Sequence, residues 1–308
     1  MKEEIYKGTV LEAKKRAQNS LTLNSQPAGL DSSYGYSIAD TVFLSERQAE
    51  DAKAYYFDAY DFLDAVHKGD TQRIENYKKQ LRKQTSIVMA NLMLGTDKDQ
   101  KTMTYDNYWM PLFTELKDVW TDSSVKNRKV IIPLGLMFKG KAGHAAVACL
   151  NFRSQKNAAD IIFLEQHAEK KGTPNYDEHF DYTDGLKLYQ DFWCEVLQHD
   201  LGIKEVHTYK NDKPISHRKR CCGVIASEVR RRLLATNDPL ASIESVVEEI
   251  PADMVDVLHK ENQAKVIEYE EKTKQRRNLL SFLKNASQTK RMNMSVSHSA
   301  QSPQSVYD

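Results

Sequence analysis

Three residue types that together can transfer acyl groups occur far apart in this sequence, in the order histidine, acid, cysteine. Cys222 is followed by Gly223 and then by apolar residues at helical spacing, so its thiol is expected at the start of a helix. At that position the helix dipole and free backbone N–H groups favour the thiolate, the form of cysteine that attacks carbonyls. His144 can take and return a proton, and Glu165 can fix the tautomer of the imidazole. These three residues are therefore the predicted catalytic set.

Two neighbouring residues offer alternatives within this set. Cys221 also carries a thiol, but the glycine directly after Cys222 favours Cys222 as the nucleophile. Asp160 and Glu165 stand at opposite ends of one predicted strand, and either could be the acid. Glu165 is favoured because the end of one antiparallel strand lies beside the start of the strand before it, where His144 is expected.

The composition excludes several classes of function. The chain has 308 residues with Lys+Arg 44 and Asp+Glu 43, so it lacks the charge excess typical of bulk nucleic-acid or membrane binding. No apolar run approaches the roughly 20 residues of a transmembrane helix. Four cysteines without a C-x-x-C pair indicate neither a disulfide scaffold nor a zinc site, and no metal or cofactor is expected.

Apolar runs predict the elements that must position the catalytic set. Three strands at residues 129–138, 145–152 and 160–165 are expected to form a buried antiparallel meander, with Pro133 interrupting the first strand. A helix at 183–199, a strand at 205–209 and the helix that begins at Cys222 follow. The predicted fold class is α+β, with a central, mostly antiparallel sheet flanked by helices.

Other segments are expected to surround this core. Ser45 begins a capping box, Gly69 ends the first helix after it, and Asp70 or Thr71 caps a second helix that closes at Gly95. The two helices predict an antiparallel hairpin, an accessory or substrate-binding element. The predicted organisation is an N-terminal segment at 1–44, the helical hairpin at 45–95, a cysteine protease core at 105–250, a C-terminal helix at 251–285 and a disordered tail at 286–308.

Residues 128–235 resemble the ubiquitin-like-protein-specific cysteine proteases (clan CE), including those that bacteria use as effectors. The matching segments are Val130–Leu134 before the histidine, His144 with Ala146–Leu150, Ile162–Glu165 ending in the acid, and Cys222-Gly223-Val224 at the nucleophile. The resemblance implies a papain-like α+β core and a Cys-His-Glu triad. It also implies hydrolysis of the isopeptide or peptide bond after the C-terminal glycine of ubiquitin or a ubiquitin-like protein.

The sequence departs from the family pattern at three positions. Ala145 stands where the family has Trp, Cys221 stands where it has Asp, and Ser216 and His217 occupy the neighbourhood of its oxyanion glutamine. The predicted oxyanion hole is therefore the Cys222 backbone N–H together with Ser216 or His217. Gln166 is a further candidate donor.

The resulting interpretation is a monomeric deubiquitinase that binds ubiquitin or a ubiquitin-like protein and its conjugates. The acidic block Glu268–Glu271 before a polar tail resembles bacterial type IV secretion signals, which implies an effector secreted into the host cytosol; otherwise the protein is cytoplasmic. One alternative is a clan CE acetyltransferase that modifies Ser, Thr or Lys, favoured by the glutamate acid and the basic loop before Cys222. The other is a catalytically weak ubiquitin-binding protein.

Overall fold

The computed structural model describes residues 38–89, 92–95, 112–137, 144–168, 183–218, 221–268 and 271. The chain divides into two compact units, Met1–Asn262 and Gln263–Asp308. All of the strands and labelled helices below belong to the first unit. Of the second unit the structure describes residues 263–268 and 271, which are helical. The predictions for residues 1–37 and for the tail at 286–308 lie outside the described residues.

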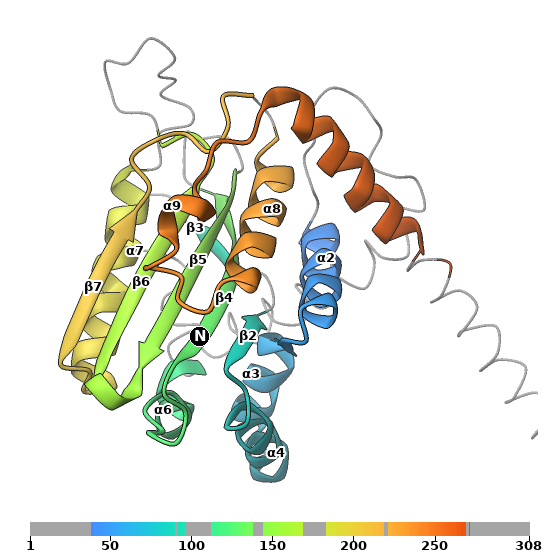
Figure 1. Cartoon of the computed structure of the whole chain (residues 1–308). Coiled ribbons are helices and arrows are strands. Elements are labelled where there is room, and N and C mark those ends of the chain that lie inside the picture. The colour runs from blue at the N-terminus through green and yellow to red at the C-terminus, as the bar shows by residue number, and fades with distance from the viewer. Residues whose placement is uncertain are drawn as a thin grey trace, which may run out of the picture. The chain divides into compact units, whose positions relative to one another are not determined.

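A seven-stranded sheet forms the centre of the first unit (Figure 1). Its strands are β1 (Tyr55–Phe57), β2 (Ser86–Met89), β3 (Leu92–Gly95), β4 (Arg128–Met137), β5 (His144–Arg153), β6 (Ala158–Glu165) and β7 (Glu205–Lys210). They lie in the order β1-β2-β4-β5-β6-β7, with β3 also paired to β4. The predicted antiparallel meander is confirmed as β4, β5 and β6, whereas the other pairings are parallel. The sheet is therefore mixed, and it is antiparallel where the site residues lie.

Helices cover both faces of the sheet, which confirms the predicted α+β layering. In Figure 1, α8 (Cys222–Ala235) lies in front of β4 and β5, whereas α7 (Thr183–Glu195) lies behind β6 and β7. A π turn (Val196–Asp200) extends α7, and Gly202 follows it in the left-handed conformation with φ 71°. The short helices α6 (Lys117–Trp120) and α9 (Ile243–Val246) and the longer α2 (Ile38–Asp51) complete the two outer layers.

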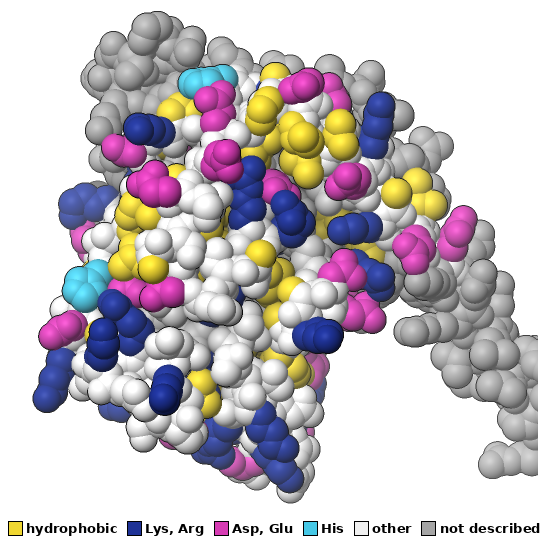
Figure 2. All heavy atoms as spheres, viewed as in Figure 1, with side chains coloured by type: hydrophobic (Ala, Val, Ile, Leu, Met, Phe, Trp, Pro, Cys, Tyr) yellow, Lys and Arg dark blue, Asp and Glu magenta, His cyan; other side chains and the backbone are white. Residues whose placement is uncertain are grey.

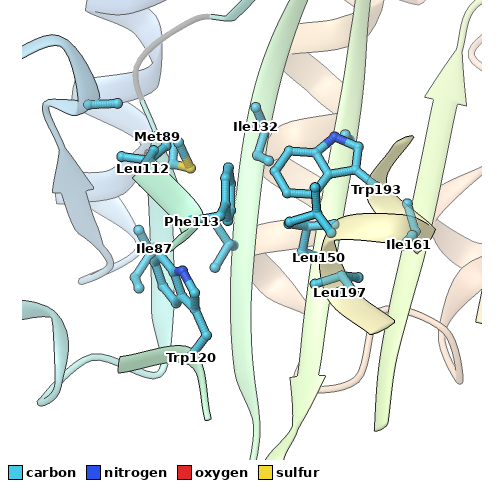
Figure 3. Packing of buried hydrophobic residues seen from close by; sticks show 14 of the residues in the cluster. Ile87, Met89, Leu112, Phe113, Trp120, Ile132, Leu150, Ile161, Trp193 and Leu197 are labelled. Carbon is cyan, nitrogen blue, oxygen red and sulfur yellow. The ribbon is translucent and has the colours of Figure 1, made fainter. Parts of the chain in front are cut away.

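The strand side chains alternate between two apolar cores. On β5, Ala148 and Leu150 face the α7 side, whereas Val147 and Cys149 face α8. Such alternation follows from the two-residue period of a strand, and burial of both faces explains why these strands read as continuous apolar runs. Figure 3 shows the α7-side core, where aromatic rings pack over the sheet. The rings of Phe113 and Trp193 meet there edge to face, with centroids 4.0 Å apart.

Pro133 does not interrupt β4, which corrects the sequence prediction. The strand runs from Arg128 to Met137, and Pro133 pairs with Val147 of β5. On the other side of β4, the register with β2 ends at Ile131 and the register with β3 begins at Leu134. Proline lacks an N–H group, so it is tolerated at the point where the neighbouring strand is interrupted.

The region 45–95 is not a separate helical hairpin, because it contributes β1, β2 and β3 to the central sheet. Ser45 lies inside α2 and donates to the carbonyl of Thr41 at 2.6 Å, so it is not an N-cap. The two predicted helices do exist in shorter form, as α3 (Ala59–Lys68) and α4 (Thr71–Leu81). Gly69 ends α3 in the left-handed conformation, and the Asp70 carboxylate caps α4, as predicted.

A buried lysine anchors the C-terminal end of α8 to the sheet. Lys129 of β4 is 6% exposed, and its Nζ donates to the carbonyls of Leu233 at 2.6 Å and Thr236 at 2.5 Å. The last carbonyls of a helix lack partners within the helix, and a cation there is favourable for the helix dipole. Burial lowers the pKa of the Lys129 ammonium. The helix that carries Cys222 is thus fixed to β4 at its far end.

The surface shown in Figure 2 mixes acidic and basic side chains, as the near-zero net charge leads one to expect. Residues 252–262 are helical, directly after Pro251, at the position where the C-terminal helix was predicted. Met254 and Val257 on this helix are 47% and 49% exposed. No helix among the described residues is long and apolar enough to cross a membrane.

Candidate active site

The fold brings the three predicted residues into one buried cluster. Glu165, the last residue of β6, pairs with Ala146 on β5, so it lies next to the start of β5 where His144 stands. His144 Nε2 and Glu165 Oε2 are 3.0 Å apart, and each residue is 5% exposed. Cys222 lies near enough to His144 to raise the pKa of its imidazole. His144 and Cys222, separated by 78 positions along the chain, thus meet at one end of the central strands.

The thiol of Cys222 lies where the sequence predicted it, on the first residue of the 14-residue helix α8. Burial by itself would raise the pKa of this thiol. The hydrogen bond and charge of His144, together with backbone N–H groups of Ala145 and Gly223, outweigh burial and lower the pKa from its ordinary value. The thiolate is therefore stabilised by a cation and by oriented N–H groups, the environment of a reactive cysteine.

The imidazole of His144 lies between the thiol and the carboxylate. Its Nε2 contacts Glu165 at 3.0 Å, and the ring also interacts with Cys222. Burial would lower the imidazole pKa, but the contacts with Cys222 and Glu165 outweigh it and raise the pKa to about 9. The ring of His167 stacks near that of His144, with centroids 5.8 Å apart. The lowered pKa of Cys222 and the raised pKa of His144 both favour the thiolate–imidazolium form of the pair.

The carboxylate of Glu165 is held by the turn that follows β6. The backbone N–H of His167 donates to Oε2 at 3.3 Å, and that of Ala168 donates to Oε1. Ala168 adopts a left-handed φ of 43°. Burial would raise the pKa of Glu165, but the hydrogen bond and charge of His144 and the N–H of Ala168 lower it. The acid is thereby kept ionised and oriented toward the imidazole.

Asn211 positions the acid, and sequence reasoning missed it. It lies just after β7 and is 2% exposed. Its Oδ1 accepts from the Glu165 N–H at 3.0 Å, and its Nδ2 donates to the Glu165 carbonyl at 2.8 Å and to the Lys213 carbonyl at 3.0 Å. The asparagine side chain thus extends the parallel pairing of β6 and β7 by one step and fixes the backbone of the acid.

The predicted oxyanion donors have their described contacts away from the triad. Ser216 is fully buried, and its Oγ accepts from the Arg218 N–H at 3.4 Å. His217 lines a surface hollow of about 460 Å³ with residues of the 249–256 segment, and its Nε2 lies 3.9 Å from Glu249 Oε1. The role of either residue as an oxyanion donor stays a prediction. Gln166, the other candidate, donates from Nε2 to Cys221 Sγ at 3.2 Å.

The two alternatives weighed from the sequence lie in different surroundings. Asp160 sits toward the other end of β6, where it bonds Asn151, Arg153 and His207. Burial raises the pKa of the Cys221 thiol to about 12, so that thiol stays protonated.

Among the described residues, no group of three or more His, Cys, Asp or Glu side chains is arranged to hold a metal ion.

Comparison with known proteins gives structural likeness alone. No protein-family model matches the chain, and no curated protein sequence does. Among solved structures, the Legionella pneumophila effector protein RavZ has a TM-score of 0.43 and 10% identity over 60% of this chain and 51% of RavZ. RavZ in complex with human LC3B gives a TM-score of 0.34 and 12% identity over 58% of this chain and 47% of that one.

The Rickettsia bellii effector protein RickCE has a TM-score of 0.35 and 12% identity, over 76% of this chain and 98% of RickCE. The chain spans about half the length of the RavZ structures that it matches. Both similar proteins are bacterial effectors. At these scores and identities the likeness assigns no role to any residue of this chain.

Proposed function

We propose that this chain is a thiol protease that uses Cys222 as nucleophile, His144 as general base and acid, and Glu165 as the residue that orients the imidazole. The observation that carries the proposal is the buried hydrogen bond between Glu165 and His144, next to a thiol at a helix start that interacts with the same imidazole. The three side chains come from β6, β5 and α8. Together they form the arrangement of nucleophile, base and orienting acid that acyl transfer requires.

The reaction follows from these positions. The Cys222 thiolate attacks the scissile carbonyl, and the tetrahedral intermediate collapses as His144 gives its proton to the leaving amine. This leaves a thioester on Cys222. His144, now neutral, takes a proton from a water molecule, which attacks the thioester and releases the carboxylate product. Glu165 keeps the imidazole in one orientation and stabilises its protonated form, while the Cys222 N–H, at the start of α8, supplies one oxyanion donor.

The substrate class in this proposal is a conjugate of ubiquitin or of a ubiquitin-like protein, cleaved after the C-terminal glycine. It rests on the resemblance of residues 128–235 to clan CE proteases, as does the proposal that the protein is a bacterial effector acting in the host cytosol.

The direct test is labelling by ubiquitin, and by a panel of ubiquitin-like proteins, that carry an electrophile at the C-terminal glycine. We expect a covalent adduct on Cys222 that is lost in Cys222→Ala and His144→Ala. Cys194→Ala is the matched control, because Cys194 is a partly exposed thiol on α7 whose pKa is raised by burial. A wild-type protein that reacts with no member of the panel contradicts the proposed substrate class.

An acetyltransferase would use the same triad with acetyl-CoA as acyl donor, and the glutamate acid favours this second candidate. The basic loop before Cys222, which also suggested it, is partly neutralised: Arg218 pairs with Asp256 at 2.6 Å. Incubation with labelled acetyl-CoA and inositol hexakisphosphate separates the candidates, because acetyl-Cys222 would form only in a transferase. A Cys222→Ala protein that keeps its full effect in cells would instead support a ubiquitin-binding role.

A further inference from the structure

Gln166, the residue directly after the acid, connects the end of β6 to the segment that leads into the nucleophile. It is 1% exposed, and its Nε2 donates to Cys221 Sγ at 3.2 Å and to the Arg218 carbonyl. Its own backbone carbonyl accepts from the Ile215 N–H at 2.9 Å. Gln166 therefore contacts Ile215, Arg218 and Cys221, three described residues that precede Cys222 in the chain.

The side chains of Gln166 and Cys221 close a ring of hydrogen bonds with the backbone carbonyl of Arg218. The Cys221 thiol donates to the Arg218 carbonyl at 3.0 Å, and the Gln166 amide donates to both members of that pair. An amide nitrogen carries two protons, so these two contacts use both of them. No side-chain donor of Gln166 then remains for the oxyanion of a substrate, which argues against the oxyanion role predicted for its side chain.

Glu165 and Gln166 are consecutive, but they contact different parts of the site. Glu165 contacts the general base, whereas Gln166 contacts the segment that delivers the nucleophile. On the basis of the proposed function, we propose that Gln166 is a positioning residue that sets the distance between the Cys222 sulfur and His144 through Cys221 and Arg218. One turn of chain then fixes the base and the nucleophile relative to each other.

The role of Cys221 in this proposal is geometric. Burial raises the pKa of its thiol to about 12, so it remains a neutral donor and acceptor across the working pH range. Its substitution therefore removes a contact without changing a charge. The same holds for Gln166→Leu, which removes both donors and keeps a side chain of similar size.

The test compares two reactions of Cys222. Hydrolysis of a substrate passes through an oxyanion, whereas alkylation by iodoacetamide requires only a thiolate. If Gln166 sets the position of the sulfur, Gln166→Leu weakens the contact of Cys222 with His144. Alkylation of Cys222, measured at a pH below the pKa of its thiol, then slows about tenfold, as for a pKa raised by one unit. We expect kcat to fall by as much as about 100-fold, with KM little changed, and Cys221→Ala to show the same pattern more weakly.

Gln48→Leu is the matched control. Gln48 is also a buried glutamine that holds α8, because its Nε2 donates to the Ser227 carbonyl at 2.9 Å and its Oε1 accepts from Arg230. It contacts the middle of the helix and not the segment before Cys222. We expect Gln48→Leu to lower the melting temperature without changing the alkylation rate of the folded protein.

Each outcome decides the proposal. If Gln166→Leu slows hydrolysis but leaves alkylation unchanged, Gln166 is an oxyanion donor and the inference is overturned. If both rates match wild type in the folded variant, the residue is only structural, and the inference is again overturned. If Gln166→Leu fails to fold, Cys221→Ala decides by the same two rates. A wild-type Cys222 no more reactive than Cys194 overturns the proposed function as well, which separates the two failures.

Discussion

Two buried carboxylates lie on strand β6, and each contacts a histidine. Glu165, at the end of the strand, contacts Nε2 of His144 at 3.0 Å, and the His144 side chain is 1% exposed. Asp160, near the start of the strand, contacts Nδ1 of His207 at 3.3 Å, and the His207 side chain is 54% exposed. Asp160 also pairs with Arg153, whose guanidinium is always charged, and accepts from Asn151.

The difference shows what makes a carboxylate–histidine contact usable for catalysis. At the Asp160 end, the negative charge is matched by a permanent cation, and the histidine remains largely in water. At the Glu165 end, the only cation in contact with the carboxylate in the described structure is an imidazole whose proton can move, and that imidazole also meets a thiol at a helix start. One end of β6 therefore holds a fixed charge pair, and the other end holds a group that can donate and accept a proton.

Substitution of each histidine should give the largest difference in activity between the two ends of β6. His144→Ala removes the proton carrier, so the rate of substrate hydrolysis should fall by about 100- to 10,000-fold, the usual contribution of general acid–base catalysis. His207→Ala should leave the rate within about twofold of wild type, because the contact of the exposed His207 side chain with Asp160 contributes little. Steady-state kinetics on both variants measure the contrast. Equal losses in the two would remove the distinction between the ends.

Neutralising each acid should give effects of different kinds. Glu165→Gln places an amide where the carboxylate accepts from His144 and from two backbone N–H groups, so activity should fall about 10- to 100-fold through misorientation of the imidazole. Asp160→Asn leaves Arg153 without its buried partner and should cost about 3 kcal/mol of unfolding free energy, with Cys222 still reactive. Urea unfolding and activity-probe labelling of both variants provide the measurement. Loss of labelling in folded Asp160→Asn would make Asp160 part of the reactive cluster.

The pH dependence should sharpen the comparison further. The imidazolium form of His144 persists below its pKa of about 9 and is lost above it, so hydrolysis should decline on the alkaline side near pH 9. In Glu165→Gln a contact that raises this pKa is gone while burial, which lowers it, remains; the alkaline limb should therefore move to lower pH. Asp160→Asn should leave the limb in place. A profile of kcat/KM between pH 5 and 10 tests this, and an unmoved limb in Glu165→Gln would show that the acid does not tune the base.

The site residues could be predicted from the sequence where they lie at the ends of segments with a clear apolar pattern. The three central strands are long apolar runs, and their order fixes which ends lie together, so the meeting of His144 and Glu165 could be predicted. The position of Cys222 at a helix start could be predicted because glycine and an apolar helical pattern follow it. β1 could not, because Tyr55 and Tyr56 fit the helical stripe of their neighbours, and a three-residue strand is too short to break a periodic pattern.

The supporting residues of the site gave no local signal. Asn211 bonds the backbone of Glu165, 46 positions away. Nothing in the sequence distinguishes it from any other polar residue that is buried and hydrogen-bonded. The separation between Gln166 and Cys221 is 55 positions. Contacts of this kind depend on how β6, β7 and the segment before α8 come together, which is decided by tertiary packing.

The lysine under α8 has a consequence for the cysteine at its other end. A 14-residue helix is a stiff rod roughly 20 Å long. Lys129 binds the last carbonyls of this rod from the same strand, β4, that pairs with the strand bearing His144. The position of the Cys222 sulfur is therefore set at both ends of α8. The residues before Cys222 act at one end, and the Lys129 contacts act at the C-terminal end. A molecule that displaced the residues around Thr236 would misalign the thiol and the imidazole without touching either.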